Sequence, residues 1–248
     1  MDGILTIESY LGRWPDNSYS RPIKVLCDDG KSYSFKGRQN GKSLITEYVV
    51  GKLGEKIDAP VPISTRINLP DLICEAIKKN DPVYFQNLAA GIGFGNQIIL
   101  NCGNKSTLNC NSCPENRERF AKLLILYSWC LAKDHQCIYQ TVPPPLVYSV
   151  DHGHFFPGGP NWTSQTLSSN LSLQALDPWF NPCNFSKDEI KDAALSLENI
   201  NDSDIEDSIS KCLDDWGINE EDRAGLSNFL KQRKKDLLRL VFQEGEQN

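Results

Sequence analysis

The chain lacks any uninterrupted apolar run of about 18 residues, which is the length that a membrane-spanning helix needs. Its first residues, Met-Asp-Gly-Ile-Leu-Thr-Ile-Glu, contain neither a basic segment nor a long apolar core, which argues against a signal peptide. Positive charge is not in excess either, because 26 Lys and Arg face 32 Asp and Glu. We therefore expect a cytoplasmic protein that does not enter membranes and does not bind nucleic acid directly.

Histidine is also scarce, with three residues, whereas cysteine is comparatively frequent, with nine. Without a secretion signal, we expect these cysteines to be reduced thiols, most of them buried. Cys102, Cys110 and Cys113 differ because they share a polar loop. A closed structural zinc site takes four ligands, so zinc at this loop is an alternative that lacks one ligand.

A β-hairpin is predicted near the N-terminus. Two strand-like runs, Ile23–Cys27 and Ser32–Lys36, flank an Asp-Asp-Gly turn. In the second run, alternation puts Lys36 on the same face as Ser34. The simpler alternative is that Lys36 is a solvated lysine at a sheet edge.

A helix is predicted to follow, from about Ser43 to Ile57, with Glu47, Gly51 and Gly54 aligned along one face. Glycine inside a helix costs roughly 1 kcal/mol relative to alanine. We therefore expect these glycines to admit a close neighbour beside Glu47. The alternative is an exposed glutamate on a weak helix.

Two glycine-rich stretches could approach phosphate. Gly91–Asn96 contains three glycines but lacks the strand-then-helix setting of a phosphate-binding loop. The Gly37–Gly41 loop directly follows Lys36, and we consider it the better candidate to cover a phosphate.

Two acids follow in the second half of the chain. The clearest predicted helix, Asn116–Lys133, leads straight into Asp134. A short strand, Val147–Val150, then presents Asp151, and Gly153 is expected to let the chain turn with a positive φ.

All three histidines, His135, His152 and His154, lie beside these acids in the sequence. Imidazoles suit Zn²⁺ or Mn²⁺, so a metal-dependent hydrolase that uses them with Asp151 is one alternative.

The order Lys36, Glu47, Asp134, Asp151 is the order in which phosphoryl-transfer enzymes of the kinase type carry their groups. A strand lysine holds nucleotide phosphates, and a helix glutamate orients that lysine. One aspartate accepts the proton of the acceptor hydroxyl, and a second, before a glycine turn, holds Mg²⁺.

The segment Ile23–Phe156 resembles the HipA-like kinases, a bacterial group with a compact, divergent protein-kinase-like fold. The matching pieces, in order, are Gly30-Lys31-Ser32-Tyr33-Ser34-Phe35-Lys36, Thr46-Glu47, Phe94-Gly95-Asn96, Trp129 with Asp134-His135, and Asp151-His152-Gly153-His154-Phe155. The resemblance implies an α+β, two-lobed fold. It has a small β-rich N-lobe at residues 1–85 and a larger, mainly helical C-lobe at 86–248.

By that resemblance, the protein would be a serine/threonine protein kinase that uses ATP and Mg²⁺. Lys36 would contact phosphate, Glu47 would pair with Lys36, Asp134 would be the catalytic base, and Asp151 would bind the metal. A protein substrate or an antitoxin-like or defence-system partner is implied as well.

One position departs from the family's pattern. The family carries a metal-binding asparagine five residues after the catalytic aspartate, and this sequence has Tyr139 there. Gln136 or Gln140 could supply the missing ligand. The alternative is a pseudokinase that binds a nucleotide or a partner without turnover. In either case His152 replaces the usual phenylalanine, and we expect it to pack or hydrogen-bond structurally.

Overall fold

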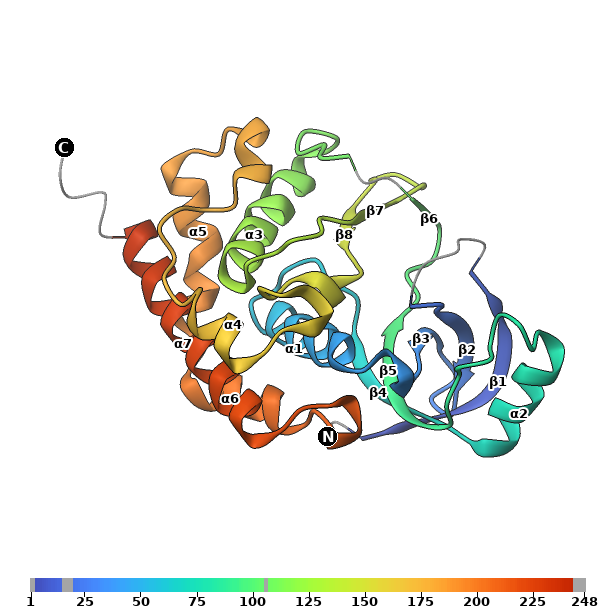
Figure 1. The fold of residues 1–248 in the computed structure, drawn as a ribbon. Helices are drawn as coiled ribbons and strands as arrows, with labels where there is room; N and C mark the ends of the chain where they lie inside the picture. The colour runs from blue at the N-terminus through green and yellow to red at the C-terminus, as the bar shows by residue number, and fades with distance from the viewer. Residues whose placement is uncertain (1–2, 15–19, 105–106, 243–248) are drawn as a thin grey trace.

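The computed structural model describes residues 3–14, 20–104 and 107–242, which form two unequal bodies side by side (Figure 1). The smaller body is a closed barrel of five strands, and the larger consists mainly of helices with a three-stranded sheet. This arrangement confirms the predicted α+β class with a β-rich and a helical lobe. No helix in the described part of the chain combines the length and hydrophobicity that a bilayer span requires.

The barrel has the strand order β1-β2-β3-β5-β4. Its members are β1 (Leu5–Arg13), β2 (Ile23–Cys27), β3 (Ser32–Lys36), β4 (Ser64–Leu69) and β5 (Gly91–Gln97). Neighbours pair antiparallel except β1 and β4, whose parallel pairing closes the barrel. Apolar side chains such as Ile7, Val25 and Phe35 fill the interior, and α2 (Asp71–Asn80) packs outside against β1. The predicted hairpin is confirmed as β2 and β3.

The glycine-rich Gly91–Asn96 stretch is a strand. A Cβ on Gly93 would lie 2.7 Å from the Phe35 ring, and one on Gly95 would lie 2.2 Å from Ile67 Cδ1. The glycines thus make room for side chains inside the barrel. Because β5 pairs with both β3 and β4, the first sheet extends past the predicted lobe boundary at residue 85.

Helix α1 (Lys42–Lys56) confirms the helix predicted from about Ser43 to Ile57. It connects two barrel strands, yet its buried side chains belong to the core of the helical body and not to that of the barrel. Its glycines do admit close neighbours. A Cβ on Gly51 would lie 2.1 Å from Ser64 Oγ, and one on Gly54 would lie 2.9 Å from Val61.

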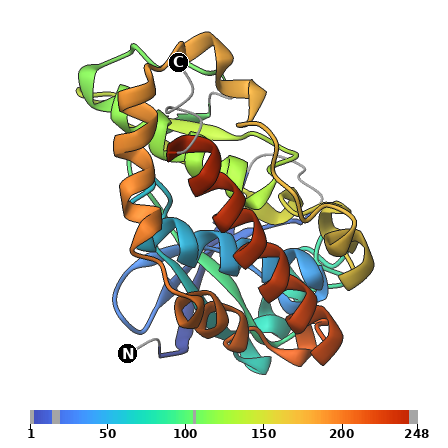
Figure 2. The ribbon, with the colours of Figure 1, turned by 90° about the vertical axis from the view of Figure 1, so that its left-hand side faces the viewer.

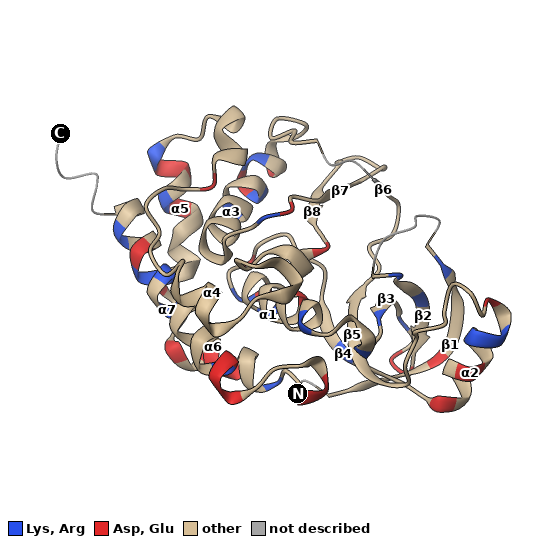
Figure 3. Ribbon diagram, in the orientation of Figure 1, with Lys and Arg blue, Asp and Glu red and all other residues tan. Residues whose placement is uncertain are grey.

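The helical body is built around α3 (Pro114–Cys130), most of which is buried. Around it lie α4 (Ser164–Ser168), α5 (Lys187–Glu198), α6 (Asp202–Ser210) and α7 (Glu220–Phe242). Figure 2 shows α7 running diagonally across the helical body. Arg233 on α7 donates a hydrogen bond to the carbonyl oxygen of Trp129 on α3 at 2.8 Å. Figure 3 shows acidic and basic residues together on α5, whereas in α7 three acids occupy the first turn and most basic residues lie further along the helix. The predicted helix to Lys133 ends earlier because Leu131 is left-handed, with φ 57°.

The second sheet has the order β6-β7-β8. It consists of β6 (Cys102–Asn104), β7 (Cys137–Gln140) and β8 (Val147–Ser149). β8 confirms the short strand predicted ahead of Asp151.

The expectation that all cysteines are reduced thiols is wrong for one pair. Cys110 and Cys183 form a disulfide with a Cα–Cα distance of 5.7 Å across a sequence separation of 73. They meet because the N-terminal end of α3 packs near the 3₁₀ helix η4 (Pro178–Cys183). Cys102 and Cys113 remain free thiols. No set of three or more His, Cys, Asp or Glu side chains suited to a metal ion occurs in the described ranges, so the zinc alternative gains no support.

Candidate active site

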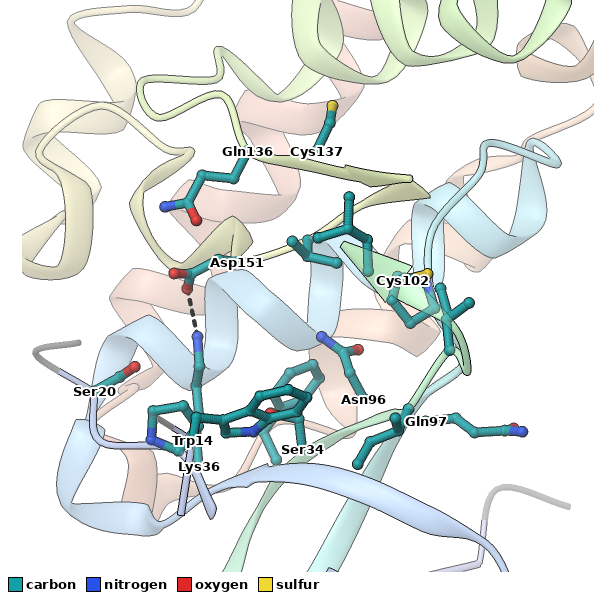
Figure 4. Close-up of a pocket in the computed structure, with 17 residues that line it drawn as sticks. Trp14, Ser20, Ser34, Lys36, Asn96, Gln97, Cys102, Gln136, Cys137 and Asp151 are labelled. Atoms are coloured by element: carbon teal, nitrogen blue, oxygen red, sulfur yellow. Dashed lines mark hydrogen bonds and ion pairs between the residues drawn. The ribbon is translucent and has the colours of Figure 1, made fainter. Parts of the chain in front are cut away.

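Lys36 joins two carboxylates at the boundary between the barrel and the helical body (Figure 4). Its Nζ forms ion pairs with Glu47 Oε1 on α1 and, at 2.5 Å, with Asp151 Oδ1 after β8. Burial alone would lower the pKa of Lys36, but the charges of Glu47 and Asp151 outweigh it and raise that pKa above its usual range. Lys36 is therefore a positively charged group held between two elements.

Glu47 is the most deeply buried member of this trio, with a side chain that is 0% exposed. Its Oε2 accepts the backbone N–H of His152 at 3.2 Å. Burial raises the pKa of Glu47, and the charge of Lys36 opposes that rise. Gly153 lets the two segments approach, because a Cβ there would lie 3.4 Å from Glu47 Oε1 and 3.3 Å from Ser43 Cβ.

Asp151 itself makes the turn that we predicted for Gly153. Its φ is 60°, in the left-handed region, whereas Gly153 lies inside the 3₁₀ helix η2 (His152–His154). The prediction was wrong because η2 begins directly after Asp151, and the glycine is needed for the contact between η2 and α1. The charge of Lys36 lowers the pKa of Asp151 to about 2, so its carboxylate is ionised.

Asp134 lies in the connection between α3 and β7 and is held by its neighbours. Gln136 Nε2 donates to Asp134 Oδ2 at 2.7 Å. The intervening His135 is anchored away from the acid, with Nε2 at 2.9 Å from Asp177 Oδ2 and its ring stacked on Trp179 at a centroid distance of 4.9 Å. Because Gln136 lines the same cavity as Asp151, the Gln136 amide links Asp134 to that cavity.

Tyr139 points away from this cavity. Its ring is buried near Phe120, its hydroxyl donates to Thr107 O at 2.7 Å, and the same hydroxyl accepts the Asn109 N–H at 3.1 Å. The side chain at the expected asparagine position is thus part of the core of the helical body.

Of the two glutamines considered as metal ligands, the structure brings Gln136 to the cavity. Gln140 pairs with Cys102 at the other end of β7 and is not among the described residues that line the cavity.

The histidines do not converge on one position. His152 is buried, with Nε2 at 2.8 Å from Ser149 Oγ, and burial lowers the pKa of His152 to about 3. This confirms the structural role expected for it. His154 is exposed, and His135 is committed to Asp177. The arrangement gives no support to a shared histidine metal site.

A cavity of about 360 Å³ opens beside Lys36 and Asp151 (Figure 4), within the range of roughly 300–1,000 Å³ typical of small-molecule sites. One end is polar and charged. Apolar side chains line much of the remainder: Pro62, Phe94, Ile98, Ile99, Ile138 and Val150. A ligand with an apolar ring and an anionic end would match both halves.

The connection between β1 and β2 borders this cavity through Trp14 and Ser20. Trp14 Nε1 donates to Ser34 Oγ on β3 at 3.1 Å. The Gly37–Gly41 loop, which we expected to cover a phosphate, leads into α1 and is not part of the described cavity lining. The sequence offered no glycine signal for the β1–β2 connection, so its role was missed.

Solved structures with a similar fold are kinases. The crystal structure of a Helicobacter pylori proinflammatory kinase, CtkA, matches with a TM-score of 0.59 at 11% identity, covering 97% of this chain and 98% of that chain. The Golgi casein kinase with Mn/ADP bound matches with a TM-score of 0.51 at 12% identity, covering 97% of this chain and 73% of that chain. At such identities the likeness shows a kinase-like fold and no more.

Among curated protein sequences, none matches this chain. A family model described as HipA-like kinase matches residues 11–156, which is more than half of the chain. Lys36, Glu47, Asp134 and Asp151 all fall within that match, and the chain belongs to the HipA-like kinase family.

Proposed function

We propose that this protein transfers the γ-phosphoryl group of ATP, in the presence of Mg²⁺, to a serine or threonine hydroxyl of a protein or of its own chain. The observation that carries the proposal is the ion pairing of Lys36 with both Glu47 and Asp151 at one end of the cavity between the lobes. Phosphoryl transfer depends mainly on positioning and on stabilisation of charge, and these groups are suited to both.

Lys36 presents a fixed positive charge to a polyphosphate. Glu47 is fully buried and receives a second hydrogen bond from His152, so it holds the ammonium group in one direction. A cation whose orientation is set before the ligand arrives stabilises anionic phosphate oxygens without reorganisation during the reaction.

Asp151 and Gln136 fit a Mg²⁺ ion. The ion prefers oxygen ligands and commonly takes one or two carboxylates together with substrate phosphates and water. Asp151 is ionised, and Gln136 uses its Nε2 on Asp134, which leaves Oε1 as an oxygen donor in the cavity lining. When bound, Mg²⁺ neutralises charge on the transferred phosphoryl group.

Asp134 is suited to accept the proton of the acceptor hydroxyl. Its Oδ2 receives the Gln136 amide, which fixes the carboxylate and leaves Oδ1 for the hydroxyl. Gln136 would thus couple the base to the metal end of the cavity.

Transfer of label from γ-labelled ATP to the protein itself and to a serine/threonine-rich protein tests this proposal. We expect Asp134→Asn and Asp151→Asn each to abolish transfer while the protein stays folded, as judged by a cooperative thermal unfolding transition. Asp192→Asn is the matched control, because Asp192 is an exposed aspartate on α5. Transfer that survives in both site variants would refute the assignment.

A second candidate is a kinase-fold protein that binds nucleotide without turnover and acts through a protein partner, such as an antitoxin-like component. Its support is Tyr139, which occupies the expected position of a metal-binding asparagine and is turned into the core. Mg²⁺-dependent ATP binding with no transfer to any acceptor, in wild type and in Gln136→Asn, would favour this candidate.

A further inference from the structure

A row of three polar side chains crosses the barrel beside the cavity. In the strand registers, Asn96 on β5 is opposite Ser34 on β3 and opposite Ser64 on β4. Asn96 and Ser34 line the cavity. In Figure 4, Asn96 lies between Lys36 and Cys102, and its amide points into the cavity.

The orientation of the Asn96 amide is set by Ser64. The Ser64 hydroxyl donates to Asn96 Oδ1 at 2.9 Å, whereas its other acceptor, Pro62 O, is at 3.4 Å. Ser64 is 1% exposed, so water does not compete for this bond. Gly51 on α1 makes the arrangement possible, because a Cβ there would lie 2.1 Å from Ser64 Oγ.

With Oδ1 engaged, the Nδ2 hydrogens of Asn96 remain for a ligand. Within the described ranges, Asn96 Nδ2 donates no hydrogen bond. A side-chain amide presents both donors and acceptors, and fixing its oxygen makes the cavity-facing end a donor. A ligand that places an acceptor atom at this position gains a hydrogen bond, and one that places a donor there does not.

The two ends of the cavity set the direction of a nucleotide. Its phosphates belong at Lys36 and Asp151, and its base belongs among the apolar side chains near Ile98 and Ile138. Ile98, Ile99 and Cys102, from the segment that joins β5 to β6, line that part of the cavity, and we place the Watson–Crick edge of a purine against this segment. The remaining inner edge, which carries N7, then faces β5.

We propose that Asn96 Nδ2–H donates to N7 of the purine ring and thereby makes the site selective for purine nucleotides. Ser64 is the positioning residue that fixes the Asn96 amide. This inference rests on the proposed function, because it requires a nucleotide whose phosphates lie at Lys36. Since adenine and guanine share N7, discrimination between them must come from elsewhere.

Calorimetric binding of ATP and 7-deaza-ATP, both with Mg²⁺, tests the contact from the ligand side without altering the protein. In the wild type, loss of one neutral hydrogen bond should make the dissociation constant of 7-deaza-ATP about 2- to 10-fold larger than that of ATP. The ratio of these two dissociation constants should fall to about 1 in Asn96→Ala, because the partner of N7 is gone.

Two further variants separate this role from a structural one. Ser64→Ala should reduce the ratio of the two dissociation constants while the dependence on Mg²⁺ persists, which a general loss of packing would not produce. Asn68→Ala is the matched control, since Asn68 lies on β4 outside the cavity lining and should leave the ratio unchanged.

Equal binding of ATP and 7-deaza-ATP by the wild type would overturn the role of Asn96 and leave the proposed function intact. An unchanged ratio of the two dissociation constants in Asn96→Ala would likewise overturn the role of Asn96 and leave the proposed function intact. If the wild type binds neither nucleotide, both the role of Asn96 and the proposed function are refuted.

Discussion

Replacement of Lys36 with methionine removes a charge but keeps most of the side-chain volume. Asp151 is 34% exposed and can turn to water, whereas Glu47 is fully buried and retains the His152 N–H at 3.2 Å. Removing one partner of a buried ion pair typically costs about 3–5 kcal/mol, because the other charge is left uncompensated. We therefore expect Lys36→Met to lower the free energy of unfolding by about that amount at mildly alkaline pH.

The loss should depend on pH, and the sign follows from Glu47. Burial raises the pKa of Glu47 in the folded state, and the variant lacks the lysine that opposes this rise. The folded variant then keeps a proton that the unfolded chain releases above a pKa of about 4.3. Its stability should fall as pH rises above that value, by up to about 1.4 kcal/mol per pH unit.

Urea unfolding followed by tryptophan fluorescence at about pH 5 and about pH 8 measures both effects. Lys78→Met is the matched control, because Lys78 forms a partly exposed pair with Glu75 and its loss should cost under about 0.5 kcal/mol. Adding Glu47→Gln to Lys36→Met should abolish the pH dependence. The reasoning would be refuted if Lys36→Met lowered the free energy of unfolding by less than about 1 kcal/mol at about pH 8, or by the same amount at both pH values.

Three other predictions concern stability. The charge of Lys36 lowers the pKa of Asp151 from 3.8 to about 2, so Asp151 stabilises the fold above its ordinary pKa and loses that effect as pH falls toward 2. Urea titrations at acid pH should show a flatter decline in Asp151→Asn than in wild type, and parallel curves would contradict this. Gly51→Ala should destabilise the protein by about 1–3 kcal/mol, measured by thermal unfolding, although alanine has the better helix propensity. The reason is that the new Cβ would lie 2.1 Å from Ser64 Oγ. A variant more stable than the wild type would show that Ser64 moves freely. Cys110→Ser should lower the free energy of unfolding by about 2–4 kcal/mol. Dithiothreitol should lower the Tm of the wild type but not that of Cys110→Ser. If dithiothreitol leaves the Tm of the wild type unchanged, the bond to Cys183 does not stabilise the fold.

The parts of the site that were predictable from sequence lie on regular local elements. Alternation in Ser32–Lys36 placed Lys36 and Ser34 on one face, and helical spacing placed Glu47 on the same helix face as Gly51. Both patterns arise from backbone geometry over a few residues, and the structure keeps them.

Other features depend on contacts between distant segments, which local patterns do not contain. Strand β5 needs glycine at positions 93 and 95 because Phe35 and Ile67 occupy the space that side chains there would fill. The left-handed backbone of Asp151 follows from the 3₁₀ helix that packs on α1.

The side chains that complete the cavity were likewise hidden. Ser64 and Asn96 come together through the register of β4 and β5, and Trp14 reaches the cavity from the β1–β2 connection. The partner of Cys110 lies 73 residues away in the sequence. None of these pairings leaves a periodic or spaced signal in a single sequence.

Calorimetric binding of ATP with and without Mg²⁺, to the wild type and to Asp151→Ala, tests the central claim most directly. We predict binding that is strengthened by Mg²⁺ in the wild type and a loss of that strengthening in Asp151→Ala, because Asp151 is the ionised ligand beside Lys36. Absence of ATP binding in every condition, or the same dependence on Mg²⁺ in Asp151→Ala, would contradict a metal–nucleotide site between the two lobes.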